Sequence, residues 1–323
     1  MALARETVEA TIPTPRLRTV PAGIMQSPVT PMTADRAVDY ATFEKLLDFH
    51  VGQGKPGTVG ITMNLHIAES LNLTIEERKR LAETAVRAVA GRVPVIVNVS
   101  TPGTDAAIDL ARHAERIGAD GVIVIAPYYW KPPQDALYEH FAAVMGSVGI
   151  AVMAYNSPAL QDGVSISPDM LTRLIDRFEN FIGLKEASHN FEMFIELRAA
   201  ARRARPDFGM MLGVEYLLPS MTMGGKGSLA AMGGIVPRLT ARLYEAVKAG
   251  KLEEAQVMQE TCSALYQICK AGYPAPIKAA MEMLGRPVGP TRLPIRTLDA
   301  PAREKLRGQL AALGIFDSEP HGW

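Results

Sequence analysis

The sequence predicts an α/β protein whose main part is a closed (β/α)8 barrel, the TIM barrel, followed by a C-terminal helical appendage. From residue 23 onward, short apolar runs of strand length alternate with longer amphipathic segments, which is the repeat of folds with a parallel sheet. Eight such runs occur before the strand pattern stops at residue 238, as a closed barrel requires. A doubly wound open sheet is the alternative, but its first turn is normally glycine-rich, and the segment 28–31 is not.

The predicted strands are short and almost entirely apolar, which suits a parallel sheet that helices cover. The eight strands are predicted at residues 24–29, 58–62, 93–99, 121–125, 150–155, 181–187, 209–212 and 227–231.

Amphipathic segments between and after the strands predict the helices. Phe43, Leu46 and Leu47 fall on one face of the first helix. Thr74 and Glu77 form a capping-box pattern at the start of the second. The predicted helices are 40–53, 74–89, 104–117, 135–145, 168–178 and 190–203, followed without further strands by 239–249, 252–271, 275–284 and 302–313.

Three parts of the chain follow from this pattern: a partly ordered N-terminal extension (1–22), the barrel (23–245) and a C-terminal helical region with its tail (246–323). The extension lacks the apolar stretch of a secretory signal, and no apolar run approaches the ~20 residues of a membrane span. Cys262 and Cys269 are seven residues apart on one expected helix face, where core packing and a reducing cytoplasm are the simplest interpretation.

Charge composition gives no reason to expect a polyanionic partner. Lys+Arg and Asp+Glu are equal at 34 each, so no net field favours nucleic acid or an anionic membrane. No cluster of His, Cys, Asp and Glu has the spacing of metal ligands. The glycine-rich segment 224–228 lacks the spacing of a phosphate-binding loop. We therefore expect a cytoplasmic protein with small-molecule partners and without a metal site.

The most informative residue is Lys185, at the carboxyl end of the predicted strand 181–187. Active sites of (β/α)8 barrels lie at that end of the strands. A lysine held there in a dry cavity can lose its proton near neutral pH and attack a carbonyl carbon. A lysine that simply reaches solvent from a strand end is the alternative.

Tyr155 ends the preceding strand, one βα unit before Lys185. The two strands should be neighbours about 4.8 Å apart. A phenol beside the amine could shuttle protons while an imine forms or hydrolyses. Packing at the barrel rim is the alternative for a single tyrosine in this position.

Several motifs in this order resemble the dihydrodipicolinate synthase / N-acetylneuraminate lyase family of class I, Schiff-base-forming aldolases. The similarity runs from about residue 24 to 313. The motifs are Val29-Thr30-Pro31, Leu73-Thr74-Ile75-Glu76-Glu77-Arg78, Pro127-Tyr128-Tyr129, Tyr155-Asn156-Ser157-Pro158, Gly183-Leu184-Lys185-Glu186-Ala187, the segment 225–237 and Pro276-Ile277-Lys278-Ala279-Ala280-Met281-Glu282.

The resemblance implies a role for individual residues. Lys185 would form the imine with a 2-oxo acid, usually pyruvate, and Tyr155 would be the general acid/base. Tyr129 would reach the site of a neighbouring subunit in a homotetramer, a dimer of dimers. Leu229 would offer its backbone carbonyl to the substrate. No cofactor is expected, because the protonated imine nitrogen is itself the electron sink.

The clearest departure from the family is in the loop after the second strand. Family members usually have Gly-Thr-Thr-Gly-Glu-Ser there, and this chain has Leu65-His66-Ile67-Ala68-Glu69-Ser70. The two hydroxyls that hold the 2-oxo acid's carboxylate are replaced by His66 and Ile67, at a cost of ~1–3 kcal/mol for each unsatisfied partner. Backbone amides of the loop could still bind the carboxylate. His66 could act as a cation or a proton relay, or could only pack.

Two further departures concern the second substrate. Dihydrodipicolinate synthases place an arginine shortly after Tyr-Asn-x-Pro to hold the carboxylate of their aldehyde substrate. Here the run 159–163 has none, and Leu160 cannot form a bidentate clamp. Trp130, with Leu65, suggests a more apolar or aromatic acceptor pocket, as in the family's hydratase-aldolases, although a subunit contact would explain Trp130 equally well.

These residues predict a Schiff-base-forming lyase or aldolase that acts on a 2-oxo acid, pyruvate or a relative, and on an aldehyde. The residue pattern suggests an apolar pocket for this aldehyde. Dihydrodipicolinate synthesis itself is not expected. The predicted catalytic residues are Lys185, Tyr155 and Tyr129, and the predicted substrate-binding residues are His66, Ile67, Leu160 and Leu229. An imine-dependent sugar-acid dehydratase is one alternative, and a catalytically impaired homologue that only binds a ligand is another.

Overall fold

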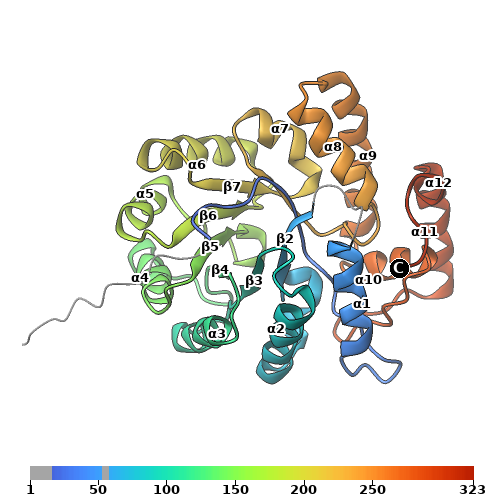
Figure 1. Ribbon diagram of the computed structural model, residues 1–323, viewed down its shortest axis with the longest axis horizontal. Coiled ribbons are helices and arrows are strands. Elements are labelled where there is room, and N and C mark those ends of the chain that lie inside the picture. Colours follow the sequence, from blue (N-terminus) through green and yellow to red (C-terminus); the bar gives the residue numbers. More distant parts are fainter. Residues whose placement is uncertain (1–16, 53–57) are drawn as a thin grey trace, which may run out of the picture.

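The computed structural model describes residues 17–52 and 58–323, and its centre is a closed barrel of parallel strands (Figure 1). The strands follow one another around the barrel in chain order, and β8 closes it by pairing with β1. The predicted fold is therefore confirmed. The strands are β1 (Gly23–Gln26), β2 (Thr58–Met63), β3 (Val95–Asn98), β4 (Gly121–Ile125), β5 (Ala151–Asn156), β6 (Phe181–Glu186), β7 (Gly209–Leu212) and β8 (Gly227–Ala230).

Helices surround the barrel, and the last ones extend beyond it on one side (Figure 1). The first predicted helix was expected to end at residue 53, which lies outside the described residues. The helices are α1 (Tyr40–Val51), α2 (Ile75–Val89), α3 (Thr104–Arg116), α4 (Gln134–Met145), α5 (Pro168–Arg177), α6 (Phe191–Ala204), α7 (Leu217–Thr222), α8 (Pro237–Lys248), α9 (Leu252–Lys270), α10 (Ala275–Met283), α11 (Ala300–Ala312) and α12 (Ile315–Ser318). Short 3₁₀ helices are η1 (His66–Ala68), η2 (Ser70–Asn72), η3 (Pro158–Leu160) and η4 (Val214–Tyr216).

The start of α2 follows the capping chemistry of the sequence. At α2 the Thr74 hydroxyl accepts the Glu77 amide, and the Glu77 carboxylate accepts the Thr74 amide, which completes the predicted capping box. The short helix α7, with η4 before it, has no counterpart in the sequence prediction. It spans only six residues and contains Pro219, so it shows too little periodicity to be recognised.

Val20 fills the barrel at the amino ends of β6 and β7, where the blue N-terminal segment crosses the strands (Figure 1). Its side chain is almost fully buried. A Cβ atom added to Gly183 would lie 2.3 Å from it, and one added to Gly209 would lie 2.4 Å away. Both strands therefore need glycine at these positions. Residues 1–16 of the predicted extension lie outside the described residues.

The C-terminal region is joined to the barrel by buried polar contacts. The Arg286 guanidinium, with the residue fully buried, donates to the carbonyls of Gly234, Pro320 and Gly322. The Glu319 carboxylate accepts two backbone amides at the start of α8. Because α8 continues to residue 248, the boundary predicted at 245 falls in its last turn, and the division into domains stays a prediction.

Both cysteines lie in α9 as free, fully buried thiols, as the core-packing interpretation expected. Burial raises the pKa of Cys262 and of Cys269 to about 12, so both stay protonated.

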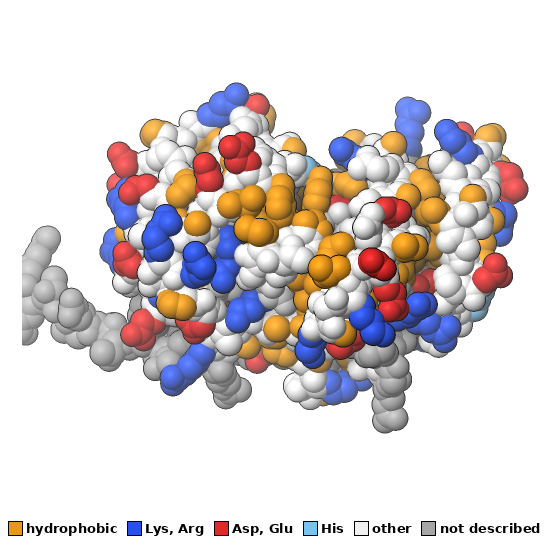
Figure 2. Space-filling model, turned by 90° about the horizontal axis from the view of Figure 1, so that it is seen from above, with side chains coloured by type: hydrophobic (Ala, Val, Ile, Leu, Met, Phe, Trp, Pro, Cys, Tyr) orange, Lys and Arg blue, Asp and Glu red, His pale blue; other side chains and the backbone are white. Residues whose placement is uncertain are grey.

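On the face in Figure 2, basic and acidic side chains are interspersed, and hydrophobic side chains gather toward the middle. Within the described residues, no helix has the length and apolar character to cross a membrane.

Candidate active site

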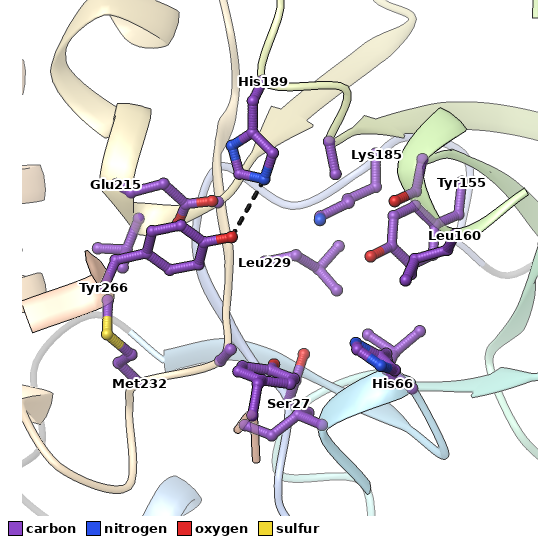
Figure 3. Close-up of a pocket in the computed structure, with 18 of the residues that line it drawn as sticks. Ser27, His66, Tyr155, Leu160, Lys185, His189, Glu215, Leu229, Met232 and Tyr266 are labelled. Atoms are coloured by element: carbon purple, nitrogen blue, oxygen red, sulfur yellow. Dashed lines mark hydrogen bonds between the residues drawn. The ribbon is translucent and has the colours of Figure 1, made fainter. Parts of the chain in front are cut away.

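A cavity of about 280 Å³ opens at the carboxyl ends of the strands. Lys185 from β6 and Tyr155 from β5 both line it (Figure 3). The two residues are direct partners in the register of β5 and β6. The Lys185 Nζ lies 4.4 Å from the centroid of the Tyr155 ring. The structure thus brings together the amine and the phenol that the sequence singled out.

The Lys185 amine is enclosed but not engaged. Lys185 is 8% exposed and Tyr155 is 9% exposed. Among the described residues, no carboxylate or carbonyl accepts a hydrogen bond from Lys185, and the amine lies over the face of the Tyr155 ring. A lysine that simply reaches solvent does not fit this burial, so the first alternative for Lys185 is not supported.

Glu186, the residue after Lys185, belongs to a different environment. Its carboxylate accepts the Ser188 amide at 2.8 Å and the Asn156 side-chain amide at 3.2 Å. Burial raises the pKa of Glu186. Because side chains alternate along a strand, Glu186 faces away from the cavity and anchors the turn between β6 and α6.

His66 and Ile67 lie at one side of the cavity, at the start of η1. The His66 ring stacks on Tyr273, with 5.1 Å between ring centroids and planes 21° apart. Burial, and then the charge of Lys185, lower the pKa of His66. At neutral pH the imidazole is therefore uncharged, which speaks against the cationic role. A neutral imidazole can relay a proton or can serve in packing alone.

A buried ion pair holds the loop that carries these residues. The Lys278 Nζ lies 3.1 Å from the Glu69 Oε1 and also donates to the carbonyls of Thr30 and Pro290. The Thr30 hydroxyl donates to the Ala68 carbonyl at 2.7 Å. Glu69 itself has a left-handed backbone with φ of 56°. These contacts fix the end of η1 to α10.

The other predicted binding residues also reach the cavity. Leu160 from η3 and Leu229 from β8 line it, and Leu65 adds an apolar wall. Among the described residues that line it, none is an arginine, as expected from the sequence after Tyr155.

Tyr129 and Trp130 lie outside this cavity. Their exposed fractions are 85% and 63%, and their rings form an edge contact with 5.6 Å between centroids. Tyr129 has a positive φ of 77°, which is uncommon for a bulky residue and is found at functional sites. In the single chain, Trp130 therefore does not form a wall of the acceptor pocket. The role of Tyr129 would need a neighbouring subunit.

A polar wall that the sequence did not predict faces Lys185 and Tyr155 across the cavity (Figure 3). Tyr266 Oη and His189 Nε2 lie 3.1 Å apart in a hydrogen bond. Glu215 and Lys270 also line the cavity, and among the described residues neither side chain has a hydrogen-bond or ion-pair partner. Burial raises the pKa of Tyr266 to about 12. Burial, reinforced by Lys185 and Lys270 but opposed by Glu215, lowers the pKa of His189.

Ser27, directly after β1, also lines the cavity and was missed. Its place at a strand's carboxyl end was the available signal, since that is where barrel enzymes place functional side chains. For Tyr266 and Lys270 no such signal exists, because they belong to a helix after the last strand. Within the described residues, no group of three or more His, Cys, Asp or Glu side chains could hold a metal ion.

Comparison with known proteins matches residues 20–313 to the model of the dihydrodipicolinate synthetase family. A 4-hydroxy-tetrahydrodipicolinate synthase of Gluconacetobacter diazotrophicus is 34% identical over 298 residues, covering 91% of this chain and 98% of the relative. The synthase of Archaeoglobus fulgidus is 32% identical over 300 residues, covering 91% of this chain and 99% of the relative.

Among solved structures, YagE, a prophage protein of the dihydrodipicolinic acid synthase family from E. coli K12 in complex with pyruvate, has a TM-score of 0.86 and 30% identity. The alignment covers 91% of this chain and 99% of YagE. A structure described as the first monomeric dihydrodipicolinate synthase variant has a TM-score of 0.85 and 26% identity, covering 91% of this chain and 97% of that one.

Proposed function

This chain belongs to the dihydrodipicolinate synthetase family of class I lyases, and we propose that Lys185 forms a Schiff base with a 2-oxo acid. One observation supports this proposal above the others. The buried amine of Lys185 has no hydrogen-bond acceptor of its own and lies against the Tyr155 ring in a cavity large enough for a small substrate. An amine placed in this way can meet a carbonyl carbon without first breaking an ion pair.

The proposed reaction begins when the Lys185 nitrogen attacks the keto carbon of the 2-oxo acid. Tyr155 passes a proton to the former carbonyl oxygen, which leaves as water and gives the imine. Loss of a proton from the neighbouring carbon produces an enamine, whose carbon attacks an aldehyde. The aldehyde oxygen takes up a proton, and water then hydrolyses the imine to free Lys185. The reverse order of these steps cleaves the same carbon–carbon bond.

The experiment that tests this function is reduction of the complex in place. We expect incubation with pyruvate and borohydride to add one reduced pyruvate unit to the protein by mass, and peptide mapping to locate it on Lys185. Lys270 also lines the cavity, so Lys270→Ala is the matched control and should still be labelled. If no adduct forms at high pyruvate concentration, the chain is a ligand-binding homologue or uses another oxo acid.

Pyruvate is the proposed donor, and the aldehyde is proposed to bind toward His189, Tyr266 and Glu215. These side chains offer hydrogen bonds, so they favour an aldehyde that carries further oxygen atoms over a wholly apolar one. The same wall would suit a hydroxylated sugar acid, the substrate class of the dehydratase alternative. A panel of aldehydes and sugar acids separates the two, because only an aldolase releases an aldehyde.

We propose that dihydrodipicolinate synthesis is not the activity of this chain, although the relatives described above carry that name. Among the described residues of the cavity, no arginine can clamp the carboxylate of the aldehyde. The identity of 34% leaves room for a different acceptor. A rate with the carboxylate-bearing aldehyde that equals or exceeds all other acceptors would contradict this part of the proposal.

A homotetramer is the proposed assembly, with Tyr129 reaching a neighbouring subunit's site. A smaller cavity of about 100 Å³ adjoins the main one and shares His66, Tyr155 and Leu160 with it. Leu71, which lines the smaller cavity, is 64% exposed. Tyr129 and Trp130 are also exposed, and we propose that these apolar side chains are covered by a neighbouring subunit. Light scattering tests the assembly, and a monomer with full activity would contradict it.

A further inference from the structure

The hydroxyl of Ser27 differs from the other unpartnered polar groups in this protein. Within the described residues, several buried side-chain atoms have no hydrogen-bond partner, including the hydroxyls of Ser27, Thr62 and Ser228. Of the atoms in that set, only the Ser27 hydroxyl belongs to a residue that lines the cavity of Lys185. A buried hydroxyl without a partner costs free energy, so a bound molecule that accepts its hydrogen bond would remove that cost.

The position of Ser27 is fixed by the barrel. Its residue is 4% exposed, and its backbone amide donates to the Ala230 carbonyl of β8 at 3.0 Å. On the other side β1 pairs with β2, and the loop after β2 carries His66 and Ile67. Figure 3 shows Ser27 and His66 on the same side of the cavity, across from His189. Ser27 therefore lies beside the loop that lacks the two expected hydroxyls.

The surroundings of Ser27 suit an anionic acceptor of hydrogen bonds. The side chains of Ile67 and Leu229, which line the same cavity, have no polar atoms and cannot accept a hydrogen bond from the hydroxyl. The carboxylate of the cavity, Glu215, lies on the facing wall beside Tyr266 (Figure 3), so it does not repel an anion at Ser27. A carboxylate only accepts hydrogen bonds. The Ser27 hydroxyl has no acceptor within the protein, so it can donate its hydrogen bond to a bound carboxylate.

We propose that Ser27 binds the carboxylate of the 2-oxo acid, with the hydroxyl donating to one carboxylate oxygen. This assignment rests on the proposed function of Lys185, because the carboxylate is attached to the carbon that the amine attacks. Ser27 on β1 then supplies the hydrogen bond that the loop after β2 no longer offers. Its effect is selectivity: 2-oxo acids are preferred over ketones of similar size that have no carboxylate.

The test compares two carbonyl compounds in the borohydride trapping assay. Pyruvate and acetone both present a methyl ketone to Lys185, and only pyruvate has a carboxylate. We expect Ser27→Ala to raise the pyruvate concentration for half-maximal trapping by about tenfold or more, the usual effect of losing a hydrogen bond to a charged group. Trapping of acetone should stay within about twofold of the unmodified protein.

Ser228→Ala is the matched control, because it also removes an unpartnered hydroxyl from a buried serine, but one outside the cavity. It should trap both compounds like the unmodified protein. Ser27→Thr keeps the hydroxyl and should retain preferential trapping of pyruvate. If Ser27→Ala does not fold, Ser27→Cys keeps the volume with a weaker donor and should show the same loss for pyruvate. Adding Ile67→Thr to Ser27→Ala should restore part of the affinity for pyruvate.

Two results would overturn the assignment while leaving the proposed function intact. The first is that Ser27→Ala and Ser228→Ala have the same dependence on pyruvate. The second is that Ser27→Ala weakens trapping of pyruvate and acetone equally, which would indicate a change in cavity shape and not the loss of carboxylate binding. If neither compound labels Lys185 of the unmodified protein, the proposed Schiff base with pyruvate is refuted, and the Ser27 assignment with it.

Discussion

Two buried lysines in this protein have opposite surroundings. Lys278 is 2% exposed, and its amine lies 3.1 Å from the Glu69 carboxylate, 2.9 Å from the Thr30 carbonyl and 2.6 Å from the Pro290 carbonyl. Lys185 is 8% exposed, and its recorded contact is the face of the Tyr155 ring. Both amines are removed from solvent, but only one of them is held by acceptors.

The difference lies in the acceptors around each amine and not in burial. An ammonium group has three donors, and three acceptors occupy those of Lys278. Burial lowers the pKa of Lys278, and the charge of Glu69 opposes this shift. The ion pair joins the loop after β2 to α10. Lys185 has no such competition, and an incoming carbonyl compound finds the amine unengaged.

The largest expected effect is on activity, from replacing Lys185. Lys185→Met should reduce turnover and imine trapping by at least about a thousandfold, because the covalent route is lost. The free energy of unfolding should change by less than about 1 kcal/mol, since no hydrogen bond is broken. Steady-state rates and urea unfolding measure the two quantities. A variant with more than a tenth of the original activity would remove Lys185 from the mechanism.

The complementary variant is Lys278→Met, which should act on stability. It leaves the Glu69 carboxylate buried without its cation, and breaking a buried pair on one side costs about 3–5 kcal/mol. Urea unfolding at neutral pH measures this loss. Replacing both partners, in Lys278→Met with Glu69→Leu, should recover part of it. If Lys278→Met is as stable as the unmodified protein, the ion pair between Lys278 and Glu69 does not stabilise the loop.

His140 is a buried base whose hydrogen-bond partner, Thr104, is neutral, so its contribution to stability depends on pH. His140 Nδ1 lies 2.9 Å from the Thr104 hydroxyl, and burial lowers the pKa of His140 from 6.5 to about 4. Between these values the unfolded chain binds more protons than the folded one. Stability therefore falls as pH drops from 6.5 toward 4, by up to about 3 kcal/mol from this group.

His140→Gln tests this contribution, because glutamine cannot take up the proton. The difference in unfolding free energy between variant and unmodified protein should shift in favour of the variant as the pH falls through this window. Unfolding by urea at several pH values supplies the difference, in which the shared titration of carboxylates cancels. A constant difference from pH 7 to pH 4 would contradict the assignment to His140.

The smallest expected effect concerns His66. If the neutral imidazole relays protons beside Lys185, His66→Ala should lower turnover by about tenfold or more, a smaller effect than the ~10²–10⁴-fold that is typical of a general acid/base residue. The Tyr273→Phe variant keeps the stacked ring under His66 and serves as the control. Unchanged turnover in His66→Ala would leave His66 with packing alone.

Much of this molecule follows from its residues, because strand and helix periodicities are local properties of the chain. Lys185 and Tyr155 end neighbouring strands, which predicts that their side chains meet. In the structure the Lys185 Nζ lies 4.4 Å from the centroid of the Tyr155 ring. Repetition of one βα unit fixes which strands are neighbours, so no long-range information was needed for this pair.

The polar wall and Ser27 could not be predicted in the same way. Tyr266 and Lys270 come from α9, and nothing in a helix pattern tells which way it packs over a barrel. His189 depends on a left-handed backbone, with φ of 59°, in the turn after β6. That the Ser27 hydroxyl has no partner is a property of all the atoms around it, so only coordinates reveal it.

Val20, Gly183 and Gly209 form one interlocking unit at the amino ends of the strands, although they are far apart in the chain. The valine occupies the space that side chains on the two glycines would need. A side chain at position 209 would therefore require a residue smaller than valine at position 20. A side chain at position 183 would also lie 2.8 Å from the Gly209 carbonyl oxygen, which a change at Val20 cannot relieve. A homologue with alanine in place of Gly209 is therefore expected to have a residue smaller than valine at the position of Val20, whereas the position of Gly183 is expected to stay glycine.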